Sequence, residues 1–245
     1  GTQPFKPEAE RLLRIGIDLV DEEALPAASY PLVLVLLPRQ REEARALLAR
    51  ACAAVAPGGV VVASVANDEG AKSREADLRQ LAGSVSVLSK HHCRVFWTAP
   101  GAGIEPLLQA QWASGDAARR IASPDVPGGG FQTRPGVFAW DRVDAASAML
   151  AAALPADLHG RVADFGAGWG YLALQVFVRS PHVASLDLYE ADARALALAK
   201  ANLAAMPDRK VPVNFHWQDV AAGVAERFDA IVCNPPFHAL GRGDR

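Results

Sequence analysis

Cysteines, long apolar runs and signal-like segments are scarce in this chain of 245 residues. The three cysteines, Cys52, Cys93 and Cys233, lie far apart and match no spacing of metal ligands, so we expect reduced thiols, no metal and no disulfide framework. No apolar run reaches the roughly 20 residues of a membrane-spanning helix, and the N-terminus lacks a charged-then-apolar signal pattern. The sequence therefore predicts a cytoplasmic protein with no membrane partner and no metal.

An excess of charge of one sign is also missing. The 25 Lys and Arg residues nearly balance the 27 Asp and Glu residues, which gives a formal net charge of −2. This balance argues against an electrostatic grip on nucleic acid over the whole surface, but it leaves room for a local basic face. Lys72, Arg74, Lys90 and Arg94 are the candidates for that face, and an ordinary solvated surface is the alternative.

Short apolar runs alternate with stretches of helical spacing on both sides of a Gly/Pro-rich segment, residues 123–130. Continuous apolar runs of this length are typical of strands buried on both faces of a parallel sheet. The alternation predicts an α/β fold with doubly wound sheets. We expect strands at residues 32–37, 60–65, 161–165, 183–189, 213–217 and 230–233, an antiparallel pair at 85–88 and 94–98, and helices at 41–55, 77–81, 144–154, 171–178 and 192–205.

A glycine-rich loop follows the strand expected at residues 161–165. It begins at Asp164 and carries Gly166, Gly168 and Gly170. Glycines let the backbone pass close to a ligand, and the N-terminus of the next helix supplies N–H groups with a positive partial charge. Nicotinamide and flavin enzymes use such a turn for pyrophosphate, so they remain competitors. The acidic start of this loop instead suits a ligand with an ammonium and a sulfonium group, and Asp164 would order the loop or reach the ammonium.

Two more carboxylates follow at the ends of the next strands. Glu190 ends the strand expected at residues 183–189, where a carboxylate can accept from both ribose hydroxyls. Asp219 follows the strand at residues 213–217 and can accept from an adenine amino group. Each alone is as readily a solvated carboxylate at a strand end. In order and in register with the glycine loop, they favour S-adenosylmethionine as the cofactor.

The sequence Asn234-Pro235-Pro236-Phe237-His238 stands directly after an apolar strand. Two prolines fix the backbone and remove two N–H donors, which leaves carbonyl groups free to accept. The amide oxygen of Asn234 and a proline carbonyl can both accept from an exocyclic NH₂ group and align its lone pair with a methyl donor. Phe237 offers a face on which a flat base can stack. Catalysis would consist of positioning and electrostatics, without a covalent intermediate.

The C-terminal half resembles the RsmC/RlmG-type ribosomal RNA guanine-N2 methyltransferases. The resemblance is carried by Arg-Pro-Gly-Val-Phe at residues 134–138, the glycine loop, the two carboxylates and the Asn-Pro-Pro-Phe-His segment. It implies that Asn234, Pro235 and Phe237 hold a guanine amine of ribosomal RNA, with 16S RNA of the small subunit as the substrate. It also implies substrate contacts by Phe131, Arg134, Phe138 and His238, and an ordinary entry segment is the alternative for residues 131–138.

The resemblance further implies two tandem Rossmann-like class I methyltransferase domains. Residues 31–39 align with residues 229–237, and in this alignment Leu36 replaces Asn234 and Arg39 replaces Phe237. We therefore expect a degenerate N-terminal domain at residues 1–122, a linker at 123–130 and a cofactor-binding domain at 131–245. The chain stops at Arg245, so we expect the second domain to be truncated after its fourth strand, which puts the activity of this polypeptide in doubt.

Two other functions remain open on the sequence alone. The same tetrapeptide can present another planar amine, such as adenine N6 or a protein glutamine amide. A non-catalytic RNA-binding module built on a decayed methyltransferase is the alternative outside enzymes.

Overall fold

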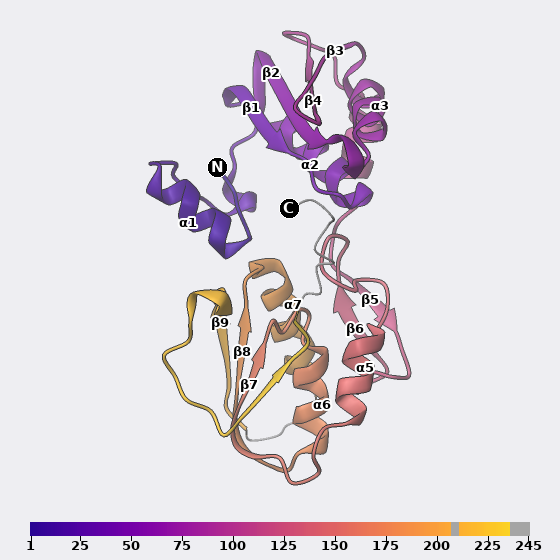
Figure 1. The fold of residues 1–245 in the computed structure, drawn as a ribbon. Helices are drawn as coiled ribbons and strands as arrows, with labels where there is room; N and C mark the ends of the chain where they lie inside the picture. Colours follow the sequence, from indigo (N-terminus) through magenta and orange to yellow (C-terminus); the bar gives the residue numbers. More distant parts are fainter. Residues whose placement is uncertain (207–210, 236–245) are drawn as a thin grey trace. The chain divides into compact units, whose positions relative to one another are not determined.

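The computed structural model describes residues 1–206 and 211–235, and the chain forms two compact units (Figure 1). The N-terminal unit comprises Val20–Ala117 and Arg134–Gly136. The C-terminal unit comprises Gly1–Leu19, Ala118–Thr133 and Val137–Arg245. Each unit has its own buried apolar cluster, so each has the core that defines a domain.

The N-terminal unit is a four-stranded mixed sheet with helices. Its strands stand in the order β1-β2-β4-β3, with β1 and β2 parallel and the other neighbours antiparallel. Side chains with no exposed area, such as Leu48, Val61 and Phe96, fill the space between sheet and helices. The elements are β1 (Tyr30–Leu36), α2 (Arg41–Ala54), β2 (Val55–Ala66), α3 (Ala71–Ala82), β3 (Val85–Lys90), β4 (Cys93–Thr98) and α4 (Pro106–Ala113), with 3-10 turns η1 (Glu22–Ala24) and η2 (Asn67–Glu69).

The basic face considered for this unit is not formed as expected. Arg74 is only 4% exposed and donates to the carbonyl oxygen of Arg39 at 2.6 Å. Arg94 donates from Nε to Glu75 at 2.6 Å. Two of the four cations are therefore committed to internal contacts, because buried polar groups need partners.

The C-terminal unit is built on a parallel sheet in the order β10-β7-β8-β9. Helices α6 and α7 contact each other and β8, as two right-handed crossovers in one direction require. The hairpin β5–β6 packs on α7 through β6. The elements are α1 (Lys6–Arg14), β5 (Arg119–Ala122), β6 (Gly130–Thr133), α5 (Ala145–Ala152), β7 (His159–Phe165), α6 (Tyr171–Arg179), β8 (His182–Glu190), α7 (Ala193–Ala204), β9 (Val213–Trp217), the 3-10 turn η3 (Val220–Ala222) and β10 (Ala230–Cys233).

The boundaries of the two units differ from the expected domain limits. The N-terminal segment belongs to the C-terminal unit, because Phe5 forms a β-bridge with Asp192 and the N–H of Lys6 donates to the carbonyl of Ala191 at 2.8 Å. The linker expected at residues 123–130 lies within the C-terminal unit, where it joins β5 to β6. Composition marked this Gly/Pro-rich stretch as a break, but it is the loop of a hairpin.

None of the helices within residues 1–206 and 211–235 is long and apolar enough to cross a membrane. Among the same residues, no group of three or more His, Cys, Asp and Glu side chains is arranged to hold a metal ion.

Candidate active site

The glycine loop, Glu190 and Asn234 lie together at the carboxyl edge of the C-terminal sheet. In the register of the sheet, Phe165 at the end of β7 pairs with both Cys233 of β10 and Tyr189 of β8. Asn234 and Glu190, the next residues along the chain after Cys233 and Tyr189, therefore lie on either side of the glycine loop. Ligands of open α/β sheets bind outside the carboxyl ends of the strands, so the sequence elements meet where a ligand is expected.

The three glycines of the loop serve two different purposes. Gly166 and Gly168 have φ of 73° and 55°, and a Cβ built on either would meet nothing within 4 Å, so the backbone there faces open space. Gly170 has φ of 92° and caps α6, and its Cβ would lie 3.1 Å from the Cβ of Ala199 on α7. The first two leave room for a ligand against the backbone, and the third allows α6 and α7 to pack closely.

Asp164 is a fully buried acid at the base of this loop. Its Oδ2 accepts from the N–H of Ala173 in the first turn of α6 at 3.0 Å, so it orders the helix that leaves the loop. Its Oδ1 is buried with no hydrogen-bond partner among the described residues. Burial, together with the nearby charge of Glu190, raises the pKa of Asp164 to about 7.

Glu190, at the end of the neighbouring strand β8, accepts a hydrogen bond from the glycine loop. Its Oε2 accepts from the N–H of Gly168 at 2.7 Å and its Oε1 accepts from the N–H of Asp192 at 2.8 Å. Burial raises the pKa of this carboxyl above its ordinary value. Two acids whose ionised forms are both disfavoured would be stabilised by a nearby cation, so this pair fits a positively charged ligand such as S-adenosylmethionine.

Asn234 directly follows β10 and, with Pro235, forms a segment that we call the Asn-Pro corner. Its amide nitrogen donates to Asp144 Oδ2 at 3.0 Å and to Ser147 Oγ at 2.8 Å. Pro235, which follows, is exposed and has no N–H of its own to donate. The predicted contacts of Phe237 and His238 lie outside the described residues.

Comparison with known proteins agrees with this geometry. Residues 128–244 match the family model described as methyltransferase small domain. Ribosomal RNA small subunit methyltransferase C of Psychromonas ingrahamii is 28% identical over 211 residues, and its counterpart in Vibrio vulnificus is 31% identical over 211 residues. These alignments cover 86% and 85% of this chain.

A solved structure is similar over nearly the whole chain. It is the T. thermophilus 16S rRNA N2 methyltransferase RsmC in complex with AdoMet and guanosine, with a TM-score of 0.78 and 25% identity over 98% of this chain. Residues 128–244 belong to the methyltransferase small domain family, and the chain is similar to RsmC-type ribosomal RNA methyltransferases. It spans 58% of the length of the two curated relatives and 65% of the solved RsmC chain. The α/β methyltransferase fold and the resemblance stated from the sequence are thereby confirmed.

Among the described residues, no hydrogen bond joins Asp219 to the glycine loop. Its Oδ1 accepts from the N–H of Ala221 at 2.9 Å and so caps the turn η3. Asp219 also lines a cavity of about 380 Å³ together with Trp217 and Lys6, whose ammonium lies 4.4 Å from the centre of the Trp217 ring. The predicted contact with an adenine amino group stays a prediction.

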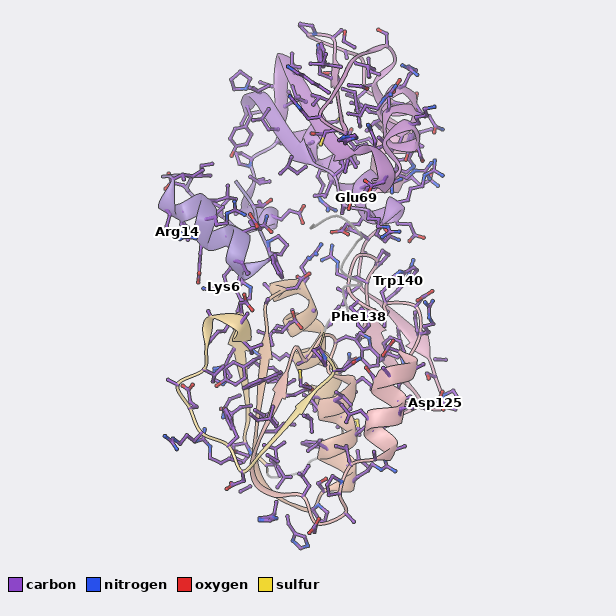
Figure 2. All side chains as sticks on the ribbon, viewed as in Figure 1. Lys6, Arg14, Glu69, Asp125, Phe138 and Trp140 are labelled. Carbon is purple, nitrogen blue, oxygen red and sulfur yellow. The ribbon has the colours of Figure 1, made fainter. Side chains whose placement is uncertain are left out.

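The substrate residues predicted within residues 131–138 lie in three different environments. Phe131 has no exposed area and its ring stacks on Trp169 at 3.9 Å, so in this conformation it packs beneath the loop and cannot contact RNA. Arg134 donates to Asp116 at 2.6 Å within the N-terminal unit. Phe138 is 66% exposed and is the member of this group that is free to contact a base (Figure 2).

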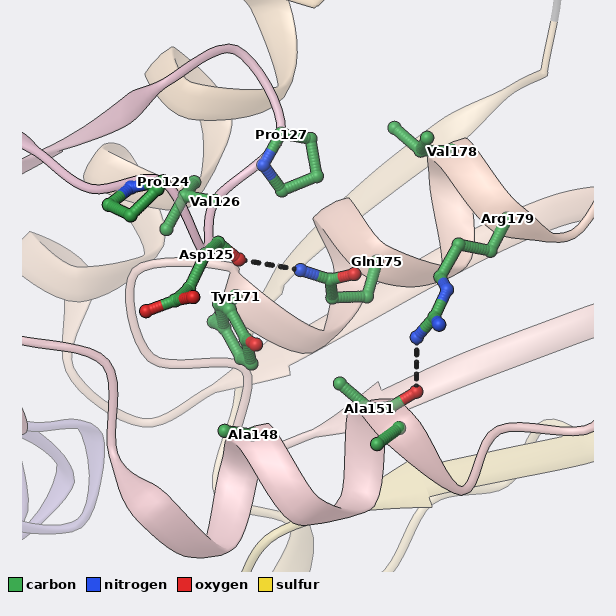
Figure 3. Close-up of a pocket in the computed structure, with 11 residues that line it drawn as sticks. Pro124, Asp125, Val126, Pro127, Ala148, Ala151, Tyr171, Gln175, Val178 and Arg179 are labelled. Carbon is green, nitrogen blue, oxygen red and sulfur yellow. Dashed lines mark hydrogen bonds between the residues drawn. The ribbon is translucent and has the colours of Figure 1, made fainter.

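A separate cavity of about 540 Å³ lies away from these residues. It is bordered by α5, α6 and the 123–130 loop, where Gln175 donates to the carbonyl of Asp125 and Arg179 donates to the carbonyl of Ala151 (Figure 3). None of the predicted site residues lines it, so its volume does not mark the site.

Several residues that contact the glycine loop or Asn234 were not predicted from the sequence. Asn202 of α7 bonds both Gln132 of β6 and the carbonyl of Trp169 in the glycine loop. Asp144 and Ser147 hold the amide of Asn234. The Asp-x-x-Ser spacing signals a helix cap, but no local pattern predicts a contact with a residue about 90 positions away.

Proposed function

We propose that this protein is an S-adenosylmethionine-dependent methyltransferase acting on the exocyclic N2 amine of a guanine in 16S ribosomal RNA of the small subunit. The observation that carries the proposal is the register that puts Asn234 at the same sheet edge as Gly166, directly after the pairing of Cys233 with Phe165. This register supports the proposal because the methyl donor and the proposed amine acceptors, Asn234 and Pro235, would then be neighbours. A ribosomal RNA substrate implies a cytoplasmic location.

The residues assigned to the cofactor are Asp164, Gly166, Gly168, Gly170, Glu190 and Asp219. When bound, S-adenosylmethionine supplies an electrophilic methyl group on a positively charged sulfonium. Gly166 and Gly168 would leave space for the ligand against the backbone, and Glu190 has lone pairs left for the ribose hydroxyls after its two backbone contacts. The buried unpaired Oδ1 of Asp164 would provide negative charge near the ligand.

The amine would be held by Asn234 and Pro235, with Phe237 as the stacking face. The oxygen of Asn234 and the carbonyl of Pro235 would accept the two hydrogens of the guanine NH₂ group. This leaves the nitrogen lone pair free to attack, and positioning of the reacting atoms supplies most of the rate enhancement. Phe138 and His238 would contact the RNA beside it.

We also infer that the N-terminal unit is a degenerate methyltransferase domain. Its parallel pair β1–β2 followed by an antiparallel hairpin supports an alignment of β1 with β10. In that alignment Leu36, which is 85% exposed and cannot accept a hydrogen bond, stands in the position of Asn234. The unit would then serve as a scaffold or as an RNA-docking surface.

The decisive experiment supplies radiolabelled S-adenosylmethionine to the protein with naked 16S RNA, assembled small subunits and glutamine-containing peptides. We expect label in RNA, recovered as N2-methylguanosine on nucleoside analysis. Label in N6-methyladenosine or in peptide alone would replace the guanine assignment. Absence of cofactor binding by calorimetry to the folded protein would favour a non-catalytic RNA-binding module.

The matched variant is Asn234→Ala. It should abolish methyl transfer while the dissociation constant for S-adenosylmethionine stays within about twofold of wild type, because the amide lies on the substrate side of the site. Transfer at the wild-type rate would show that the amine acceptor pair is wrongly assigned.

A further inference from the structure

The side-chain amide nitrogen of Asn234 donates hydrogen bonds to two residues at the N-terminal end of α5. The nitrogen is 3.0 Å from Asp144 Oδ2 and 2.8 Å from Ser147 Oγ, so each of its two hydrogens has an acceptor. No hydrogen bond to the amide oxygen exists among the described residues. The oxygen is therefore the end of the amide that is left for another partner.

The identity of these partners fixes which end faces α5. An ionised carboxylate can only accept, so the atom of Asn234 that meets Asp144 has to be the nitrogen. The carboxylate is held ionised because its Oδ2 also accepts the backbone N–H of Ser147 at 2.9 Å, and these hydrogen bonds lower the pKa of Asp144. The side chain of Ser147 also lowers the pKa of Asp144.

This orientation matters for recognition of an amine. An exocyclic NH₂ group donates two hydrogens and needs acceptors. A flipped Asn234 would present its own hydrogens to the substrate amine, and two donors facing each other repel. Without partners that distinguish nitrogen from oxygen, the two orientations of an amide differ little in shape or energy.

We propose that Asp144 and Ser147 are positioning residues for methyl transfer, which hold the amide of Asn234 with its oxygen toward the substrate amine. The inference rests on the proposed function and assigns to α5 a role beyond packing. Asp144 also caps the N-terminus of α5, so the cap and the orienting contact share one carboxylate. Because the capping hydrogen bond fixes the position of the Asp144 carboxylate, the carboxylate can hold the Asn234 amide in one orientation.

The first test compares Asp144→Asn and Ser147→Ala with wild type. Asparagine keeps the helix cap but presents an N–H to Asn234, which favours the flipped amide. We expect kcat on 16S RNA to fall at least tenfold in Asp144→Asn and about fivefold in Ser147→Ala, since one hydrogen bond is worth about that factor. The KM for S-adenosylmethionine should not change.

The control is Asp141→Asn, which removes one negative charge three residues before Asp144. The Asp141 side chain is 45% exposed and pairs only with Arg142 among the contacts observed. It should leave kcat unchanged. Equal losses in Asp141→Asn and Asp144→Asn would mean that charge near α5, and not orientation, is what matters.

Exchanging the side chains of Asn234 and Asp144 tests the orienting contact directly, because a merely structural role would not predict recovery of activity. In Asn234→Asp two carboxylates face each other, and activity should be lost. In Asn234→Asp combined with Asp144→Asn, the new amide donates to the new carboxylate, whose second oxygen can accept from the substrate. We expect the double variant to be at least tenfold more active than Asn234→Asp alone. Additive losses in this cycle would overturn the proposal.

A second measurement does not depend on turnover. The side-chain NH₂ signals of Asn234 in an NMR spectrum can be assigned from their loss in Asn234→Ala. They should exchange slowly with solvent in wild type and about tenfold faster in Ser147→Ala. If wild type is inactive but this protection is present, the proposed function fails and the orientation stands. Fast exchange in wild type would refute the orientation itself.

Discussion

Asp164 joins complete burial to an unpaired oxygen, a combination that is costly without a nearby positive charge. A buried carboxylate loses its hydration, so its neutral form is favoured. The loop residues above it, Gly166 and Gly168, have no side chain that could supply a compensating charge. We expect this charge to come from a ligand, as proposed for S-adenosylmethionine.

Replacement of Asp164 by Asn should change how stability depends on pH. The pKa of Asp164 is about 7 in the folded protein against an ordinary value of 3.8, so the unfolded chain loses this proton first as pH rises. The stability that the acid contributes at low pH is therefore lost between about pH 4 and pH 7. Asp164→Asn cannot ionise, so its free energy of unfolding should rise relative to wild type over this window, by up to about 4 kcal/mol.

Urea unfolding at pH 5 and pH 8 measures this difference. The exposed carboxyl Asp157, changed to Asn, serves as the control and should show no such trend. A gap between wild type and Asp164→Asn that stays constant with pH would contradict the burial argument.

Gly170→Ala tests the close approach of two helices. The added Cβ would lie 3.1 Å from the Cβ and 3.2 Å from the Cα of Ala199. Gly70→Ala is a matched control, since Gly70 caps α3 with φ 85° and ψ 30° against φ 92° and ψ 21° at Gly170, and its Cβ would meet only Arg74 at 3.8 Å. Both substitutions pay about 1–2 kcal/mol of left-handed strain, and Gly170→Ala should lose about 1–3 kcal/mol more through overpacking.

Thermal unfolding of both variants gives the comparison. If the two losses are equal, backbone strain alone explains the glycine and the contact with Ala199 has no cost.

At the scale of elements, α7 holds the glycine loop to the hairpin β5–β6. Asn202 on α7 is 5% exposed, and its amide donates to the carbonyls of Gln132 and Trp169 at 3.0 and 2.8 Å. Its oxygen accepts from the N–H of Gln132 at 2.5 Å. One side chain thus completes the backbone hydrogen bonding of a strand and of the glycine loop.

Asn202→Ala should destabilise the protein by about 2–4 kcal/mol, because it leaves one buried and two partly buried backbone groups without this partner. The loosened carbonyl of Trp169 should also weaken S-adenosylmethionine binding severalfold. The exposed Asn214, which bonds Asp187 at 3.0 Å, provides the control: Asn214→Ala should cost at most about 1 kcal/mol and leave binding unchanged. Urea unfolding and calorimetry measure both quantities, and unchanged cofactor affinity in Asn202→Ala would remove its role in the loop.

At the scale of the whole molecule, the chain contributes segments to its two units out of order. Arg134–Gly136 belongs to the N-terminal unit although its neighbours on both sides belong to the C-terminal one. Arg134 and Arg50 share the carboxylate of Asp116, at 2.6 and 2.9 Å. Gly136 lies so close to Glu43 that a Cβ there would overlap its carboxylate. A short segment can return to another unit because an ion pair and a glycine hold it there.

Asp116→Ala should therefore destabilise the N-terminal unit by about 3 kcal/mol at pH 7, because two arginines lose a buried partner. Burial alone would raise the pKa of Asp116, but the two arginines outweigh it and lower the pKa below 3.8. The stabilisation is therefore present at neutral pH and lost as pH falls below about 4. Asp141→Ala, which breaks the exposed pair with Arg142, should cost under about 1 kcal/mol.

Urea unfolding at pH 7 and pH 3.5 gives this comparison. A loss in Asp116→Ala that is no larger than that of the surface pair would show that the segment is held by packing instead.

Local sequence patterns were sufficient for most of the fold, and they indicated the chemistry that is proposed for the site. The strands Val213–Trp217 and Ala230–Cys233 were predicted with their observed bounds, and the other predicted elements were found within a few residues, apart from longer β2 and α3. The glycine loop and the Asn-Pro corner could be recognised because each function needs particular residue types at adjacent positions. Helices α1 and α4 and the hairpin β5–β6 were not predicted, because α1 is a polar segment that buries one residue, Ala9, and the other elements are short.

Tertiary structure alone decided which residues support the site and where the units divide. The residues around Asn202 and Asp144 in the sequence do not predict contacts with the glycine loop or with Asn234, because these partners are 33 and 90 positions away. Phe131, Arg134 and Phe138 lie in one short segment, residues 131–138, yet one is buried against Trp169, one joins an ion pair and one is exposed. The sequence determines what chemistry each residue can do, and long-range contacts determine which of those residues a ligand can reach.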